Sequence, residues 1–291
     1  YFGGGTPSIL SSDEIKSLID EVLKYFSFNS DIEITLEANP DDLDKAFLRG
    51  IADSPINRLS IGTQSFFEED LKLMNRAHSA SEAESSIKRA QDFGLENISI
   101  DLIYGSPTSS LEIWKDNLNK TIALEVPHIS SYALTVEPKT ALENWIENGK
   151  VESPKEAEQN REFFYMKDFL KNHNFDHYEI SNFGKPGFHS KHNSSYWKYC
   201  EYLGIGPSAH SYNGNEIRSW NVASNHQYIK KINLNTLAKE EEILSPKDQF
   251  NEMIMIGLRT TWGVDLLNLK EKFNEEILEQ FQNDIKLNIS N

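Results

Sequence analysis

The chain has 291 residues, of which 38% are hydrophobic and 25% charged, a composition typical of a globular protein and not of a disordered one. Its formal net charge of −16 argues against nucleic acid as a partner, because Lys and Arg form no local cluster that would offset it. No apolar run approaches the ~20 residues of a membrane span. The single cysteine, Cys200, excludes an intramolecular disulfide, so we expect a cytoplasmic protein without a membrane span.

Helix-like and strand-like segments alternate through the first half of the chain. Helices are predicted at about 12–27, 41–53, 67–74, 80–93 and 110–123, and strands at about 31–38, 58–64, 98–104 and 128–134. Strands that alternate with helices indicate βα units and a parallel sheet. Periodicity alone does not decide between a barrel and an open sheet.

The pattern changes after about residue 150. A long helix is predicted at about 154–172, and a strand-like stretch at 175–180 follows it. A region rich in glycine and aromatic residues comes next, and the tail from about 224 is predicted to be helical. We therefore expect three parts, residues 1–150, 151–223 and 224–291.

Polar residues that stand at or near strand ends are the first candidates for a site, because ligands of parallel α/β folds gather at the carboxyl ends of the strands. These candidates are Gly3-Gly4-Gly5-Thr6, Glu37, Gln64 and Asp101. Asp101 stands out, since a carboxylate inside an apolar strand is costly unless it is paired or lines a cavity. Each candidate also has a structural interpretation: the glycines as a tight turn, Glu37 as a helix cap and Gln64 as a satisfied turn residue. Likewise, an isolated arginine such as Arg76, between two predicted helices, is usually solvated.

Taken together, these residues resemble the radical S-adenosylmethionine (SAM) core of oxygen-independent coproporphyrinogen III oxidases and their haem-chaperone relatives. The matching segments, in chain order, are Tyr1-Phe2-Gly3-Gly4-Gly5-Thr6-Pro7-Ser8, Glu37-Ala38-Asn39-Pro40, Arg58-Leu59-Ser60-Ile61-Gly62-Thr63-Gln64-Ser65-Phe66, Asn75-Arg76 and Asp101-Leu102-Ile103-Tyr104-Gly105. The resemblance covers about residues 1–215. It implies an α/β fold: an incomplete (βα)6 radical SAM barrel that lacks its first βα unit, followed by a mostly helical, truncated C-terminal region.

The resemblance also implies roles in SAM binding for eight residues. Contacts to the methionyl amine are implied for Gly4, Gly5 and Thr6, and Glu37 would face the same cofactor. The remaining implied contacts are Gln64 and Asp101 to the ribose hydroxyls, Arg76 to the SAM carboxylate and Ala133 to the adenine side.

One feature of that family is missing from the chain. The family holds a [4Fe–4S] cluster on a Cys-x3-Cys-x2-Cys loop upstream of its Gly-Gly-Gly-Thr-Pro motif, whereas Cys200 is alone and far downstream. One thiolate cannot hold a cluster that several cysteines normally bind. We therefore expect the cluster ligands upstream of Tyr1, removed by truncation, and no metal site in this fragment.

A second motif, His192-Asn193-Ser194-Ser195-Tyr196-Trp197, distinguishes the branches of the family. His192 follows Gly184, Pro186 and Gly187, so we expect it on a loop, where a neutral imidazole is a good axial ligand for haem iron. Nearby aromatic rings would stack on a porphyrin. The alternative is a helix N-terminus with a satisfied histidine and two core aromatics.

The segment resembles the His-Asn-x-x-Tyr-Trp motif of the haem-chaperone branch, which implies haem binding by His192, Asn193, Tyr196 and Trp197. We therefore predict a haem chaperone that uses SAM, a [4Fe–4S] cluster and haem, with apo-haemoproteins as recipients and no catalytic residue assigned. An oxygen-independent coproporphyrinogen III dehydrogenase of porphyrin biosynthesis is the alternative. A diverged barrel without a cofactor is a third interpretation. His210 replaces an apolar residue of the oxidases near SAM, and its role is not predicted.

Overall fold

The computed structural model describes residues 1–289. It consists of two compact units, and the boundary between them in the sequence lies between Ser190 and Lys191. The first unit, residues 1–190, holds the βα segments, and the second unit starts at Lys191.

A six-stranded sheet forms the centre of the first unit, with strand order β1-β2-β3-β4-β6-β5. Its strands are β1 (Thr35–Ala38), β2 (Arg58–Gln64), β3 (Ile98–Tyr104), β4 (His128–Ala133), β5 (Asp176–Glu179) and β6 (Asn182–Gly184). Strands β1 to β4 are parallel, whereas β6 runs antiparallel to both β4 and β5. The parallel part brings the carboxyl ends of four strands to one edge.

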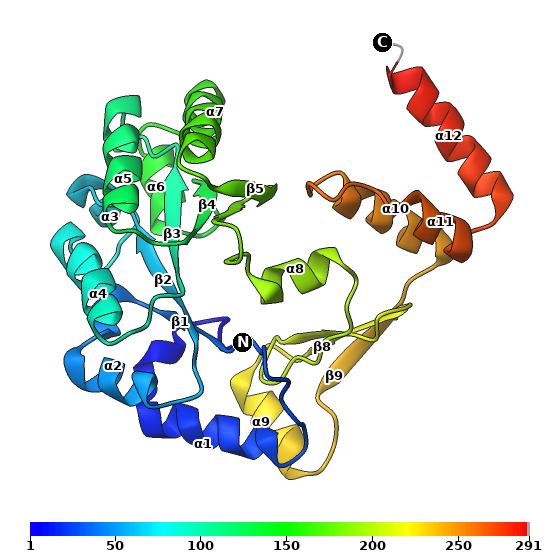
Figure 1. Ribbon diagram of the computed structural model, residues 1–291, viewed down its shortest axis with the longest axis horizontal. Coiled ribbons are helices and arrows are strands. Elements are labelled where there is room, and N and C mark those ends of the chain that lie inside the picture. The colour runs from blue at the N-terminus through cyan, green and yellow to red at the C-terminus, as the bar shows by residue number, and fades with distance from the viewer. Residues whose placement is uncertain (290–291) are drawn as a thin grey trace. The chain divides into compact units, whose positions relative to one another are not determined.

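Helices connect these strands, and Figure 1 shows α2, α4 and α5 along the outer side of the sheet. The α-helices of this unit are α1 (Ser12–Leu23), α2 (Lys45–Ala52), α3 (Glu68–Leu73), α4 (Ala80–Asp92), α5 (Leu111–Ala123), α6 (Ala141–Glu147) and α7 (Glu156–Asn172), and two short 3-10 turns are η1 (Pro7–Ile9) and η2 (Pro40–Asp42). Capping boxes start α1 at Ser11 with Glu14 and α4 at Ser79 with Glu82, which explains why both helices begin where they do.

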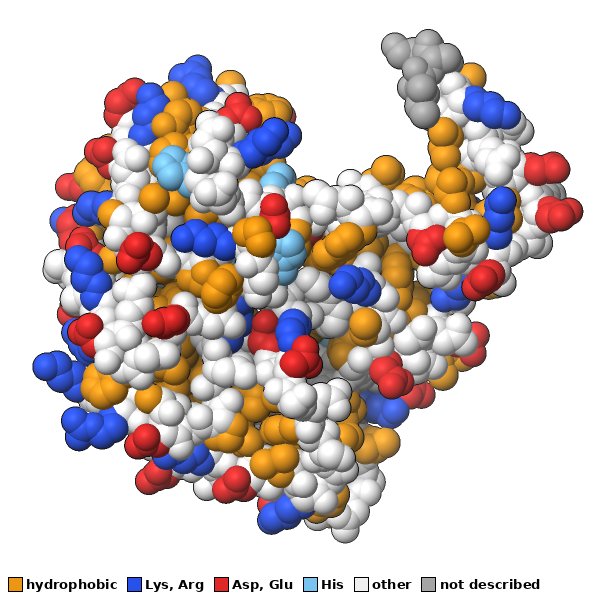
Figure 2. Space-filling view, in the orientation of Figure 1, with side chains coloured by type: hydrophobic (Ala, Val, Ile, Leu, Met, Phe, Trp, Pro, Cys, Tyr) orange, Lys and Arg blue, Asp and Glu red, His pale blue; other side chains and the backbone are white. Residues whose placement is uncertain are grey.

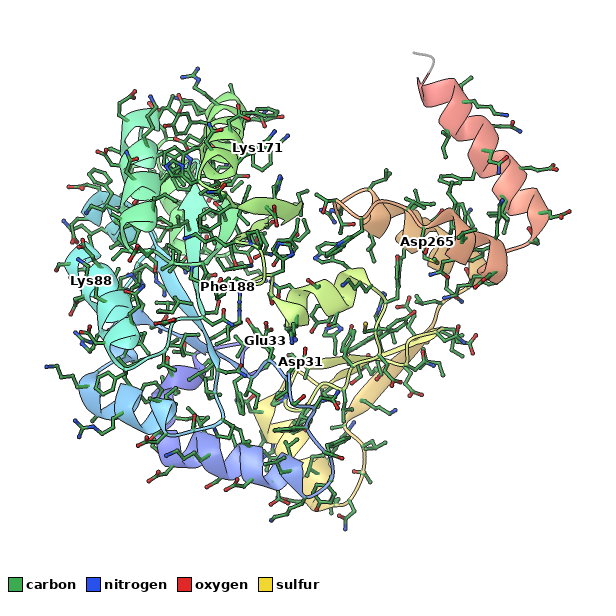
Figure 3. All side chains as sticks on the ribbon, viewed as in Figure 1. Asp31, Glu33, Lys88, Lys171, Phe188 and Asp265 are labelled. Carbon is green, nitrogen blue, oxygen red and sulfur yellow. The ribbon has the colours of Figure 1, made fainter. Side chains whose placement is uncertain are left out.

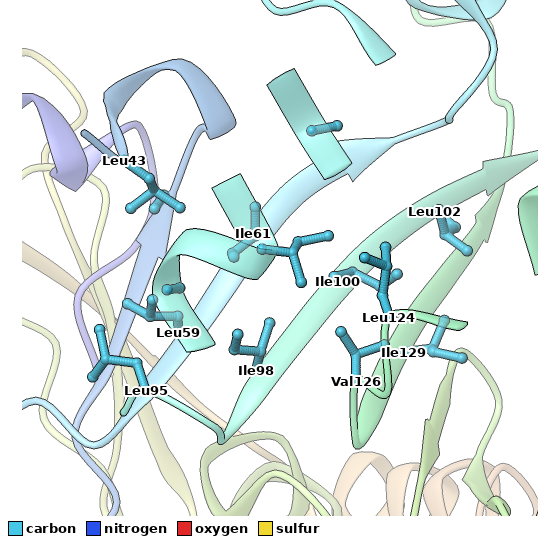
Figure 4. Close-up of a cluster of buried hydrophobic side chains, with 14 of the residues drawn as sticks. Leu43, Leu59, Ile61, Leu95, Ile98, Ile100, Leu102, Leu124, Val126 and Ile129 are labelled. Carbon is cyan, nitrogen blue, oxygen red and sulfur yellow. The ribbon is translucent and has the colours of Figure 1, made fainter. Parts of the chain in front are cut away.

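The apolar face of the sheet packs against these helices. Successive strand residues point to opposite faces, so Leu59 and Ile61 share one face, as do Ile98, Ile100 and Leu102. All five side chains are fully buried. Figure 4 shows them packed with residues from the helices and loops, among them Leu43, Leu95, Leu124 and Val126. Burial of this cluster stabilises the unit and fixes the register of the strands.

The opposite face of the same strands is polar. The register places Glu37 beside Ser60 across β1 and β2, and Asp101 beside Ser130 across β3 and β4. Because paired residues point to the same side, these four side chains share one face, which we call the polar face. Asp101 therefore lies opposite the helix-covered core, which resolves the apparent conflict of a carboxylate in an apolar strand.

Most predicted elements of the first unit are present. The strands at 58–64 and 98–104 have the predicted bounds. The helix predicted at 41–53 is interrupted: η2 ends at Asp42, and Asp44 caps a separate α2 by accepting from the Phe47 amide at 2.8 Å. A capping aspartate inside the predicted segment is the signal for this break.

The second unit combines helices with a small antiparallel sheet of order β7-β8-β9. Its elements are α8 (Lys191–Trp197), β7 (His210–Tyr212), β8 (Ile217–Asn221), α9 (Asn225–Asn233), β9 (Lys239–Ile243), α10 (Pro246–Gly257), α11 (Leu266–Lys272) and α12 (Glu275–Ile289). Helices dominate after residue 224, as predicted, but the prediction of a wholly helical tail missed β9. Every residue of β9 is exposed, so the strand has no apolar alternation to reveal it.

None of the helices in the described part of the chain is both long and apolar enough to cross a membrane. On the face of the molecule seen in Figure 2, acidic and basic side chains are interspersed over the helices of the first unit.

Candidate functional site

The glycine run lies beside the end of β1. Phe2 forms a parallel bridge with Leu36, and the Gly4 amide donates to Glu37 Oε2 at 3.2 Å. A Cβ atom at Gly3 would lie 2.6 Å from Glu37 Oε1, so only glycine allows the chain to pass the carboxylate this closely. Gly4 has a left-handed backbone with φ of +82°, and a Cβ atom at Gly5 would meet nothing within 4 Å. The backbone of Gly4 and Gly5 is therefore exposed, with open space next to it.

Glu37 anchors this loop and remains partly exposed. Its Oε1 accepts from the Tyr1 hydroxyl at 2.6 Å, while its Oε2 accepts from Gly4. Loss of hydration, followed by the hydrogen bond to Glu37, raises the pKa of Tyr1, so its hydroxyl stays protonated and continues to donate. The contact of Tyr1 with Glu37 was not predicted from the sequence. The position of Tyr1 next to the glycine run was the only indication of it.

Arg76 reaches the end of β2 from the loop between α3 and α4. Its Nη2 donates to Asn39 Oδ1 at 2.7 Å and to the Gly62 carbonyl at 3.3 Å. A Cβ atom at Gly62 would lie 3.2 Å from both Arg76 Nη2 and Gln64 Nε2. Both side chains therefore pack directly against the backbone of Gly62. The solvated interpretation of Arg76 is wrong, because Asn39 fixes its guanidinium at the strand ends.

Gln64 ends β2 in an uncommon conformation. Its φ is +65°, and the register between β2 and β3 shifts between Ile61 and Gln64. A left-handed backbone at a residue other than glycine costs free energy, and such residues gather at functional sites. The bulge turns the Gln64 side chain toward Gly62 and Arg76.

Asp101 is the electrostatic centre of the polar face. Loss of hydration, followed by the negative charge of Glu37, raises the pKa of Asp101 to about 7. The neighbouring hydroxyl groups of Ser130 and Ser60 and the charge of Arg76 oppose that rise in the pKa. Tyr132 lies on the same face, and burial together with the charge of Asp101 raises its pKa to about 12.

The two remaining SAM candidates flank this arrangement. Ala133 is the last residue of β4 and pairs with Tyr104 of β3. Thr6 precedes η1, and its side chain makes no capping hydrogen bond with that turn. The structure thus places all eight candidates at the carboxyl edge of the parallel strands or along the polar face beneath it.

The Nε atom of Arg76 is buried at this edge and lacks a hydrogen-bond partner among the described residues. Buried polar atoms are nearly always satisfied, so a vacant donor on a guanidinium suggests a bound acceptor. Two carboxylates, a guanidinium and exposed glycine backbone suit a ligand that has an amino-acid head and hydroxyl groups. The residues therefore fit SAM.

The described residues do not supply a cluster site. Cys200 is exposed and free, and no group of three or more His, Cys, Asp or Glu side chains in residues 1–289 is arranged to hold a metal ion. Residues 1–289 therefore offer no set of cysteine ligands for a [4Fe–4S] cluster.

The His-Asn-x-x-Tyr-Trp motif lies in the second unit on α8. The loop prediction for His192 is wrong, because α8 begins at Lys191. The helix is short and rich in residues with modest helix propensity, so its sequence gives a weak helical signal. His192 and Tyr196 stand one turn apart, with ring centroids 4.9 Å apart in an edge-to-face arrangement. His192 is partly buried and Tyr196 is 41% exposed, so this edge of α8 is accessible within the unit.

Trp197 and Asn193 occupy the neighbouring stripe of the same helix, since residues four apart share a face. Both are partly buried. After Trp197 the chain leaves the helix through Tyr199, whose φ is +56°, and the Cys200 amide donates to the Ser195 carbonyl at 3.1 Å. This turn follows the end of α8 at Trp197 and fixes the motif at its C-terminal end.

Comparison with known families identifies the class. Residues 1–120 match the family model described as the Radical SAM superfamily, and residues 244–291 match the HemN C-terminal domain. The structure also resembles coproporphyrinogen III oxidase (HemN) from Escherichia coli, with a TM-score of 0.81 over 98% of this chain and 68% of that one at 23% identity. These matches confirm the predicted radical SAM fold with a helical C-terminal region. The superfamily implies SAM and a [4Fe–4S] cluster as cofactors.

Two relatives give the family within this class. The heme chaperone HemW of Lactococcus lactis is 38% identical over 94% of this chain and 72% of the relative. The protein of the same name from Bacillus subtilis is 34% identical over 98% of this chain and 76% of the relative. The chain therefore belongs to the heme chaperone HemW family of radical SAM proteins, as the motifs predicted.

Proposed function

We propose that the protein binds haem on α8 and delivers it to apo-haemoproteins. The observation that carries the proposal is the His-Asn-x-x-Tyr-Trp motif, which in this family member forms a helix with His192 and Tyr196 ring to ring. An imidazole nitrogen of His192 would coordinate the iron, and Tyr196 would pack against the porphyrin. Membership of the HemW family supports this assignment. The protein would act in the cytoplasm, where a lone exposed thiol such as Cys200 stays reduced.

In the first unit, the proposal gives each of the strand-end residues a SAM contact. Glu37 and the backbone carbonyl groups of Gly4 and Gly5 would accept hydrogen bonds from the methionyl amine together with Thr6. Arg76 would pair with the carboxylate through its vacant Nε, and Gln64 and Asp101 would bind the ribose hydroxyls. Ala133 would lie against the adenine.

The bound cofactors would supply radical or regulatory chemistry, while the residues of this chain hold and orient the ligand. The proposal assigns no catalytic residue.

A haem titration tests the proposal. Replacing His192 by alanine in the full-length protein is expected to weaken haem binding about tenfold and to shift the Soret band, since one strong axial ligand is lost. The matched control is His226→Ala, which removes an exposed histidine from α9 in the same unit and should leave the spectrum unchanged. Absorbance titration at constant salt gives both quantities.

Two results would contradict this assignment. Equal affinities and spectra for the wild type and His192→Ala would remove His192 as a ligand. A wild type that binds no haem but converts coproporphyrinogen III would replace the chaperone by the dehydrogenase.

A further inference from the structure

A pocket of about 410 Å³ lies within the second unit, next to the end of α8. It is lined by Trp197, Lys198, Tyr199, Met253, Gly257, Thr260, Trp262, Gly263, Val264, Asp265 and Asn268. Its walls come from the end of α8, from α10, from the loop that follows α10 and from the start of α11. The volume falls in the range of small-molecule sites. All residues from Met253 onward belong to the segment that matches the HemN C-terminal domain.

The pocket is continuous with the haem motif. Trp197, the last residue of the motif, forms part of its wall, whereas His192 and Tyr196 lie on the adjacent stripe of α8. Seven residues of helix span about 10 Å, so one flat molecule of porphyrin size reaches both stripes. The segment after α10 and the His-Asn-x-x-Tyr-Trp motif therefore form one continuous surface.

Two indole rings and one ammonium group give the pocket its chemical character. Lys198 Nζ lies 4.9 Å from the ring centroid of Trp262, which holds the cation at the pocket. Trp262 is 46% exposed, and Met253 and Val264 add apolar wall. The combination of flat apolar surface and a positive charge suits a planar molecule that carries a carboxylate.

The pocket also contains one acidic residue, Asp265, which is labelled in Figure 3 at the start of α11. Its Oδ1 accepts from the amides of Leu267 at 2.9 Å and Asn268 at 3.1 Å. Because these bonds orient the carboxylate toward the first turn of α11, its charge is partly compensated there. Lys198 is the cation among the lining residues.

We propose that this pocket receives the propionate-bearing edge of the porphyrin, with Lys198 paired to a propionate and with Trp197 and Trp262 against the ring. The inference rests on the proposed haem function and deepens it: recognition uses the carboxylate of the ligand as well as its iron. A metal-free porphyrin acid should therefore bind, and its ester should bind less well.

The test uses the full-length protein with protoporphyrin IX and its dimethyl ester, followed by quenching of tryptophan fluorescence. We expect the wild type to bind the acid about threefold more tightly than the ester, in keeping with a partly exposed ion pair. Lys198→Met should abolish that preference. The matched control Lys247→Met, an exposed lysine at the start of α10, should keep it.

A second variant tests the aromatic wall. Trp262→Leu should weaken binding of both the acid and the ester by about three- to tenfold, because it removes ring stacking without changing charge. Circular dichroism of each variant establishes that the second unit is folded, and Lys198→Met tests the pocket independently of Trp262.

The outcomes separate this inference from the function on which it rests. If the wild type binds haem but shows no preference for the acid, or if Lys198→Met retains the preference, the pocket does not hold a propionate, while the haem function stands. If the wild type binds neither haem nor protoporphyrin, the proposed function fails as well. A pocket occupied by a second copy of the chain would appear as dimerisation that Trp262→Leu abolishes without any porphyrin effect, and this would overturn the inference.

Discussion

An Asp101→Asn variant is expected to bind SAM about 10- to 100-fold more weakly than the wild type and to be more stable at pH 8. The loss of affinity follows from the proposed contact, because hydrogen bonds to a charged group contribute about 1.5–3 kcal/mol. The gain in stability follows from the polar face, where Asp101 is held in a poorly hydrated position near the negative charge of Glu37.

The sign of the pH effect follows from the raised pKa. Asp101 titrates near 7 in the folded chain and near its usual value of 3.8 when unfolded, so the folded state binds more protons between these values. Stability of the wild type is therefore unaffected by this group below about pH 4 and falls as the pH rises toward 7. The shift sets an upper limit of about 4 kcal/mol, and because Asp101 is partly exposed we expect about 1–2 kcal/mol.

Urea denaturation at pH 5 and pH 8 measures the stability effect, and calorimetric titration measures the SAM affinity. The advantage of Asp101→Asn should be largest at pH 8 and should shrink at pH 5. Asp116→Asn, an exposed position on α5, is the control for removing one negative charge and should change neither quantity. A variant less stable than the wild type at pH 8, or one with unchanged SAM affinity, would disprove the account.

The sequence contained most of the information for the parallel half of the first unit. Strands β2 and β3 were predicted with correct bounds because β-branched and apolar residues alternate between clear turn signals. The same alternation did not explain Asp101, since a sequence does not show which face of a strand lies away from the helix-covered core. Only the register of β3 against β4 places Asp101 beside Ser130.

Other parts were not predictable because tertiary contacts decide them. The charged strand β9 is held by pairing with β8, where Trp220 Nε1 donates to Glu240 Oε2 at 3.2 Å, and a run of glutamates gives no strand signal. Helix α8 has weak intrinsic helical preference, which led to the incorrect loop prediction for His192. The role of Asn39 in holding Arg76 was also missed, although the residue stands in a recognised segment.

A buried polar cluster beneath the end of β2 was not anticipated either, and it supports the second large prediction. Asn117 on α5 accepts from the Phe66 amide at 2.6 Å and donates through Nδ2 to Ser65 Oγ at 3.2 Å. Ser65 in turn donates to Asp70 at 3.0 Å, and Thr108 donates to the same carboxylate at 2.7 Å. Ser65, Asp70 and Asn117 are each at most 2% exposed. These hydrogen bonds hold Ser65 and Phe66, the two residues that follow Gln64, in place.

Asn117→Ala is expected to lower the free energy of unfolding by about 3 kcal/mol, because it leaves the buried Phe66 amide and the Ser65 hydroxyl without this partner and adds a small cavity. Gln64 is held in its left-handed conformation by the turn that Asn117 anchors, so SAM affinity should also fall at temperatures where the variant is fully folded. Urea denaturation and calorimetric titration measure the two effects. Asn119→Ala, an exposed asparagine two residues along the same helix, should change stability by less than about 0.5 kcal/mol. If the two variants were equally stable, the cluster would not anchor the strand end, and the position of Gln64 would have to depend on the bulge between β2 and β3 alone.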